Sequence, residues 1–265
     1  MSGTQQFEHA HRKQIYEYIE RNGAVTPETV RTNVLIRPET GSKPARSGPR
    51  LEPSVSLSAD EFEHHVSILK RDGYVEEHEG RLRVALPVDE ETTTVDVEGI
   101  EAAVRPARQE DITGIVGVIE TVADVESYVV AARLAEEVTR DDVLLRHNES
   151  EDRVFFVATV DDDTVGWLHV GGAKAPRMEH TATLTLGVLD QYRGHGLGAA
   201  LMERGLAWAG DHDYRKIYQN LPATNERAIA FLEANGWTVE STREGHYYID
   251  DELVDEVQLA IWVGE

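Results

Sequence analysis

A glycine-rich turn at residues 193–198 (RGHGLG) restricts the fold of this chain more than any other feature of the sequence. Before it, Glu179–Leu189 alternates apolar and threonine side chains, as a half-buried strand does. After it, residues 197–208 carry an apolar stripe at helical spacing. A turn between a strand and a helix presents free N–H groups at the positive end of the helix dipole, and glycines let an anion approach them. The segment therefore predicts a phosphate site, which a diphosphate fits well.

Three known phosphate-binding motifs compete for this turn. A P-loop needs G-x-x-x-x-G-K, and that pattern occurs nowhere in the chain. The Rossmann fingerprint needs G-x-G-x-x-G, whereas the spacing here is Gly194-x-Gly196-x-Gly198. A Rossmann turn also follows the first parallel strand of its domain, but this turn follows three predicted strands in a meander. The pattern R-x-x-G-x-G remains, beside the alternative of a glycine-rich loop that binds nothing.

That pattern, Arg193-x-x-Gly196-x-Gly198, resembles the Q/R-x-x-G-x-G/A loop of the Gcn5-related N-acetyltransferase (GNAT) family. Residues 225–237 resemble the N-x-x-A-x-x-F-Y-x-x-x-G-F segment of the same family, with one predicted strand (residues 216–221) between the two. The resemblance covers about residues 102–265. It implies an α+β fold with a mixed, mostly antiparallel sheet containing a splayed pair of strands, and acetyl-CoA as co-substrate.

The resemblance also implies roles for single residues. The pantetheine arm would lie between the splayed strands and pair with the backbone of Leu186 and Val188, and the Val188 N–H would polarise the thioester carbonyl. The pyrophosphate would be held by N–H groups of residues 193–199, and Asn225 would bond the cofactor arm. Arg193 would add charge near a CoA phosphate or pair with Asp190. The implied cofactor-binding residues are Leu186, Val188, Arg193, Gly194, His195, Gly196, Leu197, Gly198, Ala199 and Asn225.

Two positions depart from the family pattern. Leu232 stands where many relatives carry a tyrosine that protonates the departing thiolate, and Asn220 where relatives that acetylate protein N-termini often carry an acid. At pH 7, a lysine amine with a pKa of ~10.4 pays about 4.6 kcal/mol to become neutral, whereas an α-amine near ~7.8 pays about 1 kcal/mol. The sequence therefore favours a low-pKa amine, or a base recruited from elsewhere, and direct attack on the bound thioester.

Several side chains are candidates for the missing acid and base. We select Glu179 as base through a water molecule and Tyr248 as acid, although a loop end and strand-face packing are the stronger explanations of these two residues. His169, His180 and Tyr247 are further candidates. The 11 histidines are scattered along the sequence, so no metal site is expected.

The sequence predicts two domains joined by a linker. Residues 101–265 form the GNAT-like domain, and residues 88–100 are polar and acidic and predict the linker. Residues 1–87 predict three helices and a hairpin turning at Glu79-Gly80, with a loop at residues 39–53. This order resembles a winged helix. Its third predicted helix exposes several acidic side chains, so DNA binding is disfavoured and a protein-contact or structural role is preferred.

The charge balance is strongly acidic, with 49 Asp and Glu against 26 Lys and Arg. Only five of the basic residues are lysines, Lys13, Lys43, Lys70, Lys174 and Lys216. Such a surface resembles that of halophilic proteins, where molar salt shortens the Debye length to about 3 Å and screens self-repulsion. An ordinary acidic protein with a basic partner is the alternative. Cysteine is absent, and no apolar stretch approaches a membrane span or a secretory signal, so we expect a cytoplasmic protein that does not enter a membrane.

Together these features predict an N-acetyltransferase that transfers an acetyl group from acetyl-CoA to a primary amine in a ternary complex. The predicted partners are an amine-bearing acceptor, either a protein or a small molecule, and a second copy of the chain in a homodimer. The alternative is a non-catalytic acyl-CoA-binding regulator that acts through the winged-helix-like domain on DNA or a protein. Leu232 and Asn220 favour this alternative, while the glycine loop serves both.

Overall fold

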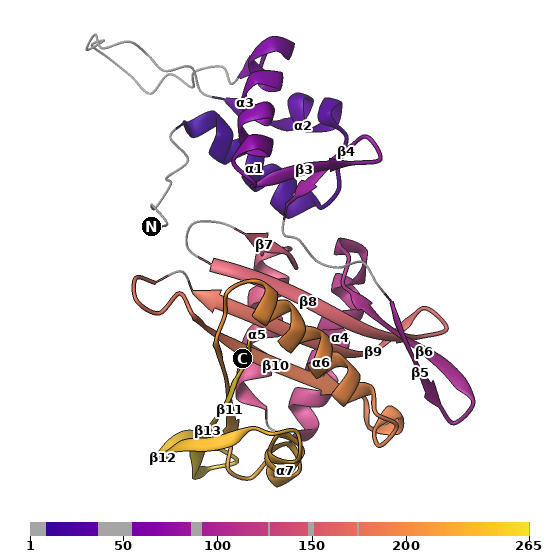
Figure 1. Ribbon diagram of the computed structural model, residues 1–265, viewed down its shortest axis with the longest axis vertical. Coiled ribbons are helices and arrows are strands. Elements are labelled where there is room, and N and C mark those ends of the chain that lie inside the picture. The colour runs from indigo at the N-terminus through magenta and orange to yellow at the C-terminus, as the bar shows by residue number, and fades with distance from the viewer. Residues whose placement is uncertain are drawn as a thin grey trace. The chain divides into compact units, whose positions relative to one another are not determined.

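The computed structural model describes residues 9–36, 55–85, 92–126, 128–147, 151–173 and 175–264. It divides into two compact units, residues 1–86 and residues 87–265 (Figure 1). In the described part of the chain, no helix is both long and apolar enough to cross a membrane.

The first unit contains three helices and a short hairpin. Ser58 begins the third helix with a capping box to Glu61, and Thr26 caps the second. Glu79 and Gly80 both have positive φ angles, 49° and 74°, which is the backbone of a two-residue hairpin turn. The predicted loop at residues 39–53 lies outside the described residues. The elements are α1 (Ala10–Asn22), α2 (Pro27–Asn33), β1 (Leu35–Ile36), β2 (Val55–Ser56), α3 (Ala59–Arg71), β3 (Val75–His78) and β4 (Arg81–Val84).

Apolar side chains of α1 and α3 form the core of this unit. Ile15 and Ile19 of α1 and Leu82 of the hairpin are fully buried. Leu69 of α3 has 1% of its surface exposed. His65 of α3 is also buried, with 7% of its surface exposed. Burial, with the neighbouring His9 and His11, lowers the pKa of His65 to about 4, so its imidazole is neutral at pH 7.

The second unit is built on one mixed sheet. Its strands lie in the order β12-β13-β11-β10-β9-β8-β6-β5, and β7 pairs with β8 at one end. Among the described strands, only β10 and β11 pair in parallel, which confirms the predicted mixed, mostly antiparallel sheet of an α+β fold. The elements are β5 (Thr93–Val97), β6 (Ile100–Pro106), α4 (Ile112–Glu126), α5 (Val129–Asp141), β7 (Arg146–His147), β8 (Glu151–Val160), β9 (Asp163–Ala173), β10 (Thr181–Val188), α6 (Leu197–Asp211), β11 (Lys216–Pro222), α7 (Glu226–Ala234), β12 (Thr238–Ile249) and β13 (Glu252–Trp262).

The predicted linker at residues 88–100 is wrong over its second half. Thr93–Val97 forms β5, and Glu98 and Gly99, both with positive φ, turn it back onto β6. β5 is the outermost strand, so most of its side chains meet solvent and are free to be acidic or hydroxylated, while Val97 is buried. This half-exposed strand has the composition of a linker, which explains the error. Residues 86–91 lie outside the described part.

Helices cover both faces of this sheet. A Cβ at Gly187 of β10 would come 3.1 Å from Val122 of α4, whereas a Cβ at Gly205 of α6 would come 2.5 Å from Leu168 of β9. Gly187 pairs with Trp167, the residue before Leu168, so the two contacts lie on opposite faces of the sheet. Helix α4 therefore packs on one face with α5 beside it, and α6 packs on the other (Figure 1).

The contact of Gly205 with Leu168 predicts a stability difference between two glycines. Gly205→Ala should lower the free energy of unfolding by about 1–3 kcal/mol, because the new methyl group overpacks Leu168. Gly117→Ala in α4 is the matched control, because a Cβ there meets no atom within 4 Å. It should stabilise the protein by about 0.5–1 kcal/mol through helix propensity. Chemical denaturation checks both, and equal effects of the two changes would contradict this packing.

Candidate functional site

The parallel strands β10 and β11 separate partway along their length. They pair at only three positions, Thr181 with Lys216, Ala182 with Ile217 and Thr183 with Tyr218. Both strands continue, β10 to Val188 and β11 to Pro222. The gap between their carboxyl ends is thus bordered on the β10 side by unpaired backbone.

The alternation of β10 shows which of its backbone groups face this gap. The N–H of Leu189 donates to the carbonyl of Val165 at 2.9 Å, so the odd-numbered residues bond to β9. The N–H and C=O groups of Leu186 and Val188 therefore point to the other side, toward β11. These are the two residues whose backbone the family resemblance assigns to the pantetheine arm.

The glycine loop follows directly at the open end of β10. Gly194 and Gly196 have φ angles of 84° and 88°, a conformation that residues with a Cβ rarely adopt. Gly196 is the N-cap of α6, with no side-chain hydrogen bond at this cap, and its carbonyl accepts the N–H of Ala200 at 2.9 Å. Within the described chain, the N–H groups of residues 194–199 make no backbone hydrogen bond.

The loop therefore fits the predicted anion site. Its unbonded N–H groups stand at the positive end of the 15-residue helix α6. A Cβ at Gly194 or Gly196 would meet no heavy atom within 4 Å, so the loop conformation does not serve internal packing. Space and donors are thus available for a diphosphate of the size found in coenzyme A.

Arg193 ties the loop to the strand before it. Its Nε donates to the carbonyl of Val188 at 2.6 Å, and its Nη1 lies 3.7 Å from Asp190. Of the two roles expected for Arg193, the structure contains the ion pair with Asp190, at the long separation of 3.7 Å. On the other side of the loop, Nε2 of His195 lies 3.9 Å from Glu98 in the β5–β6 turn.

An apolar wall lies beside the loop. A Cβ at Gly198 would come 3.4 Å from the ring of Phe231 in α7 and 3.8 Å from Leu186. Asn225 begins α7, where its Oδ1 accepts the N–H of Ala228 at 3.2 Å. Asn225 therefore orders the helix that carries Phe231, and its bond to the cofactor arm stays a prediction.

The structure does not bring the selected acid and base together. Glu179 is exposed just before β10 and lies nine residues from Val188, about 30 Å along an extended chain. Tyr248 is 70% exposed and its hydroxyl lies 3.3 Å from Asp251 in the β12–β13 turn. Neither position is beside the open end of β10, so the geometry favours neither role.

The remaining candidates differ in burial. Burial lowers the pKa of His169 to about 3, which leaves a weak base, and its Nδ1 lies 3.3 Å from Thr185 Oγ1. His180 is exposed next to Glu179. Leu232 is buried, and Oδ1 of Asn220 accepts from Gln258 at 3.1 Å.

The structure adds a carboxylate that the sequence did not single out. Glu256 of β13 is 3% exposed and accepts the hydroxyl of Tyr247 at 2.6 Å. Arg243 pairs with the other carboxylate oxygen, Oε1, and Nε2 of His246 lies 3.4 Å from Oε2. Burial and the bond to Glu256 raise the pKa of Tyr247. Glu256 pairs in register with Pro222, at the carboxyl end of the strand that borders the gap.

A polar pocket of about 220 Å³ lies between α5 and the sheet. Its residues come from α5, the start of β8, the end of β9 and the start of β10. Thr185, on its floor, is three residues from Val188, about 10 Å along the strand. The lining residues are Val130, Arg133, Leu134, Glu137, Glu151, Asp152, Arg153, His169, Gly171, Gly172, Thr183 and Thr185.

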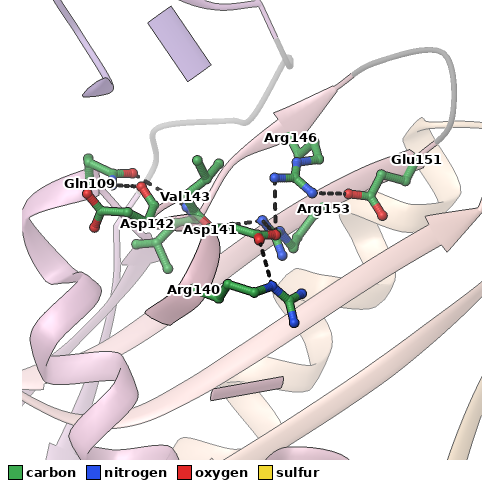
Figure 2. A network of polar contacts seen from close by, with 9 residues as sticks. Gln109, Arg140, Asp141, Asp142, Val143, Arg146, Glu151 and Arg153 are labelled. Carbon is green, nitrogen blue, oxygen red and sulfur yellow. Dashed lines mark hydrogen bonds and ion pairs between the residues drawn. The ribbon is translucent and has the colours of Figure 1, made fainter. Parts of the chain in front are cut away.

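An ion-pair network fixes one wall of this pocket. Figure 2 shows Asp141, at the end of α5, among Arg140, Arg146 and Arg153, at 3.3, 3.3 and 3.7 Å. The buried Arg153 also donates to the carbonyl of Val143 at 3.0 Å. These contacts hold the carboxyl end of α5 against the start of β8 and keep the pocket polar.

Comparisons with known proteins agree with this geometry. Residues 122–237 match the sequence model of the Acetyltransferase (GNAT) family. The acetyltransferase of GNAT family from Streptococcus pneumoniae is 17% identical with a TM-score of 0.50, over 62% of this chain and 100% of that one. The protein smu.2055 from Streptococcus mutans UA159 is 21% identical with a TM-score of 0.51, over 60% and 98%. At these identities the likeness shows the fold. No curated protein sequence matches the chain.

The loop geometry predicts a selective loss of coenzyme A binding. Gly196→Val forces a β-branched residue to φ 88° and places its side chain where the N–H groups meet the anion. Losing two or more charge-assisted hydrogen bonds should weaken binding by at least about 100-fold. Gly80→Val, at φ 74° in the β3–β4 turn, imposes a similar backbone strain away from the loop. Calorimetric titration with coenzyme A compares them, and unchanged affinity of Gly196→Val would place the nucleotide elsewhere.

Proposed function

Because residues 122–237 form an acetyltransferase domain of the GNAT family, we propose that this chain transfers an acetyl group from acetyl-CoA to a primary amine. The observation that carries the proposal is the juxtaposition of two features. The pair β10–β11 opens after three residues, and unbonded N–H groups of residues 194–199 lie at the open end. The opened strand pair would bind the extended pantetheine arm, and the N–H groups would bind the diphosphate.

In this proposal, main-chain groups make most of the contacts with acetyl-CoA. Residues 194–199 hold the pyrophosphate, and Leu186 and Val188 align the arm with their gap-facing backbone groups. When bound, acetyl-CoA supplies an activated thioester. An N–H of β10 stabilises the negative charge that develops on the carbonyl oxygen when the amine attacks. The thiolate can leave without an acid, because thiols ionise near a pKa of ~8.5.

We assign the acceptor to the face of the sheet covered by α5. The polar pocket there contains both carboxylates and guanidinium groups, and its floor lies about 10 Å from Val188. Tyr247 and Glu256 then replace Tyr248 and Glu179 as proton carriers. The new pair is buried, hydrogen-bonded and next to the strand that borders the gap, whereas the former two residues are exposed.

The remaining features of the sequence complete the proposal. The first unit is a winged-helix-like domain for protein contact more than for DNA, the surface is adapted to high salt, and the protein is cytoplasmic. Their support is the element order of the first unit, the net charge of −23 and the absence of cysteine. Light scattering measures whether the protein forms a homodimer.

Turnover with a suitable amine is the direct test. With acetyl-CoA and peptides, release of free thiol should be detectable, and at pH 7 a free α-amine should react about 300-fold faster than a lysine side chain of equal access. The ratio follows from the neutral fractions at pKa values of ~7.8 and ~10.4. The assay is run from low to molar KCl, and activity that requires salt supports the halophilic surface. Tight binding of coenzyme A without turnover, together with a DNA mobility shift, would instead support the regulator.

The two candidate acid–base pairs predict opposite outcomes. Glu256→Gln and Tyr247→Phe should each lower kcat by about 100-fold or more, because each removes a proposed proton carrier. Glu179→Gln and Tyr248→Phe are the matched controls and should leave kcat unchanged, since both residues are exposed. If Glu256→Gln lowers only the melting temperature and keeps the wild-type pH profile, Glu256 is a structural residue.

A further inference from the structure

Three histidines meet in the first unit, far from the glycine loop in sequence. His9 stands just before α1, His11 lies in its first turn, and His65 lies in the middle of α3. One ring nitrogen from each lies within 4.8 Å of the other two. We propose that His9, His11 and His65 form a binding site for a divalent transition-metal ion, with zinc as its occupant.

The arrangement of the rings supports a shared ligand. Ring centroids are separated by 4.5 Å between His9 and His11, 4.6 Å between His9 and His65, and 5.5 Å between His11 and His65. Nδ1 of His9 accepts the backbone N–H of His11 at 3.3 Å, which leaves its Nε2 for the ion and fixes the ring at the helix start. The backbone thus orients the first ligand, as partners of metal-bound histidines commonly do.

A second observation points to the same place. His65 is 7% exposed, and its Nδ1 is fully buried without a hydrogen-bond partner in the described part of the chain. A buried ring nitrogen without a partner is unfavourable, and unsatisfied polar atoms of this kind are rare in native proteins. A metal ion bound through this nitrogen would give it the partner that it lacks.

The donor set selects the type of ion. Imidazole nitrogens suit zinc, nickel and copper, whereas magnesium and calcium require oxygen ligands. Zinc–nitrogen bonds of about 2.0–2.1 Å in a tetrahedron place the nitrogens about 3.3 Å apart, so the rings need to close by at most about 1.5 Å. Three nitrogens leave one position for water. Glu61 and Arg12 lie nearby with opposite charges, and Glu61 is held by Ser58 in the capping box.

The consequence is a cross-link between distant parts of the first unit. His11 and His65 are 54 positions apart, so the ion would tie the start of α1 to the middle of α3. Since the site does not exist in the unfolded chain, binding of the ion adds to the stability of this unit. The metal would be structural and independent of acetyl transfer.

Titration of the full chain with metal ions tests the proposal. After chelator treatment and dialysis, the protein should bind one zinc ion per chain, and cobalt should bind with the visible absorption bands of a tetrahedral site. His11→Gln and His9→Gln should each weaken zinc binding by at least about 100-fold, because each removes a ligand. His78→Gln is the matched control, since His78 is exposed in β3 and is not part of the cluster.

Two results would overturn the site. One is the absence of stoichiometric zinc binding by the wild-type chain, and the other is wild-type affinity in both His9→Gln and His11→Gln. Circular dichroism of each variant before the titration separates loss of the ligand from loss of the fold. The measurement does not depend on acetyl-CoA, so its failure would leave the proposed acetyl transfer untouched.

Discussion

The central constraint on the second unit is the short parallel pairing of β10 with β11. A parallel pair needs a crossover, and here α6 provides it, packed on the sheet through Gly205 and Leu168. Because pairing ends at Thr183 and Tyr218, the gap-facing backbone groups of Leu186 and the N–H of Val188 are not paired with β11. Unpaired backbone in the middle of a sheet is costly unless water or a ligand bonds to it, so the break itself points to a bound chain-like molecule.

The glycine loop adds a site for a negatively charged group at the open end of β10. The loop follows the open end of β10 and starts helix α6, so its N–H groups lie where an arm leaving the gap would end. Nε of Arg193 donates to the Val188 carbonyl, and this bond fixes the loop to the last residue of β10. In the proposed mode of binding, one continuous segment, residues 186–199, therefore positions both the arm and the diphosphate.

How far the sequence predicts this structure depends on how local each signal is. The strand before the loop, the helix start after it and the hairpin turn at Glu79-Gly80 are encoded within a few residues, and the structure confirms all three. Strand β5 was missed because an edge strand tolerates acidic side chains, so its composition resembles a linker. Glu256 was missed because its burial depends on Tyr247 and Arg243 from another strand, and the histidine cluster because His65 is distant from His9 and His11 in sequence.

The chemistry of the site follows from where ionisable groups are buried. Glu179 is exposed just before β10, so no neighbouring side chain holds it toward the gap. Glu256 is enclosed, with Arg243 on one oxygen and the Tyr247 hydroxyl on the other, so its charge is held in place without contact with bulk water. In the proposed reaction, Glu256 receives the proton of the attacking amine beside Pro222, at the carboxyl end of β11. Proton transfer would then depend on this end of β11 and β13, the choice of acceptor on the pocket under α5, and binding of coenzyme A on the backbone of residues 186–199.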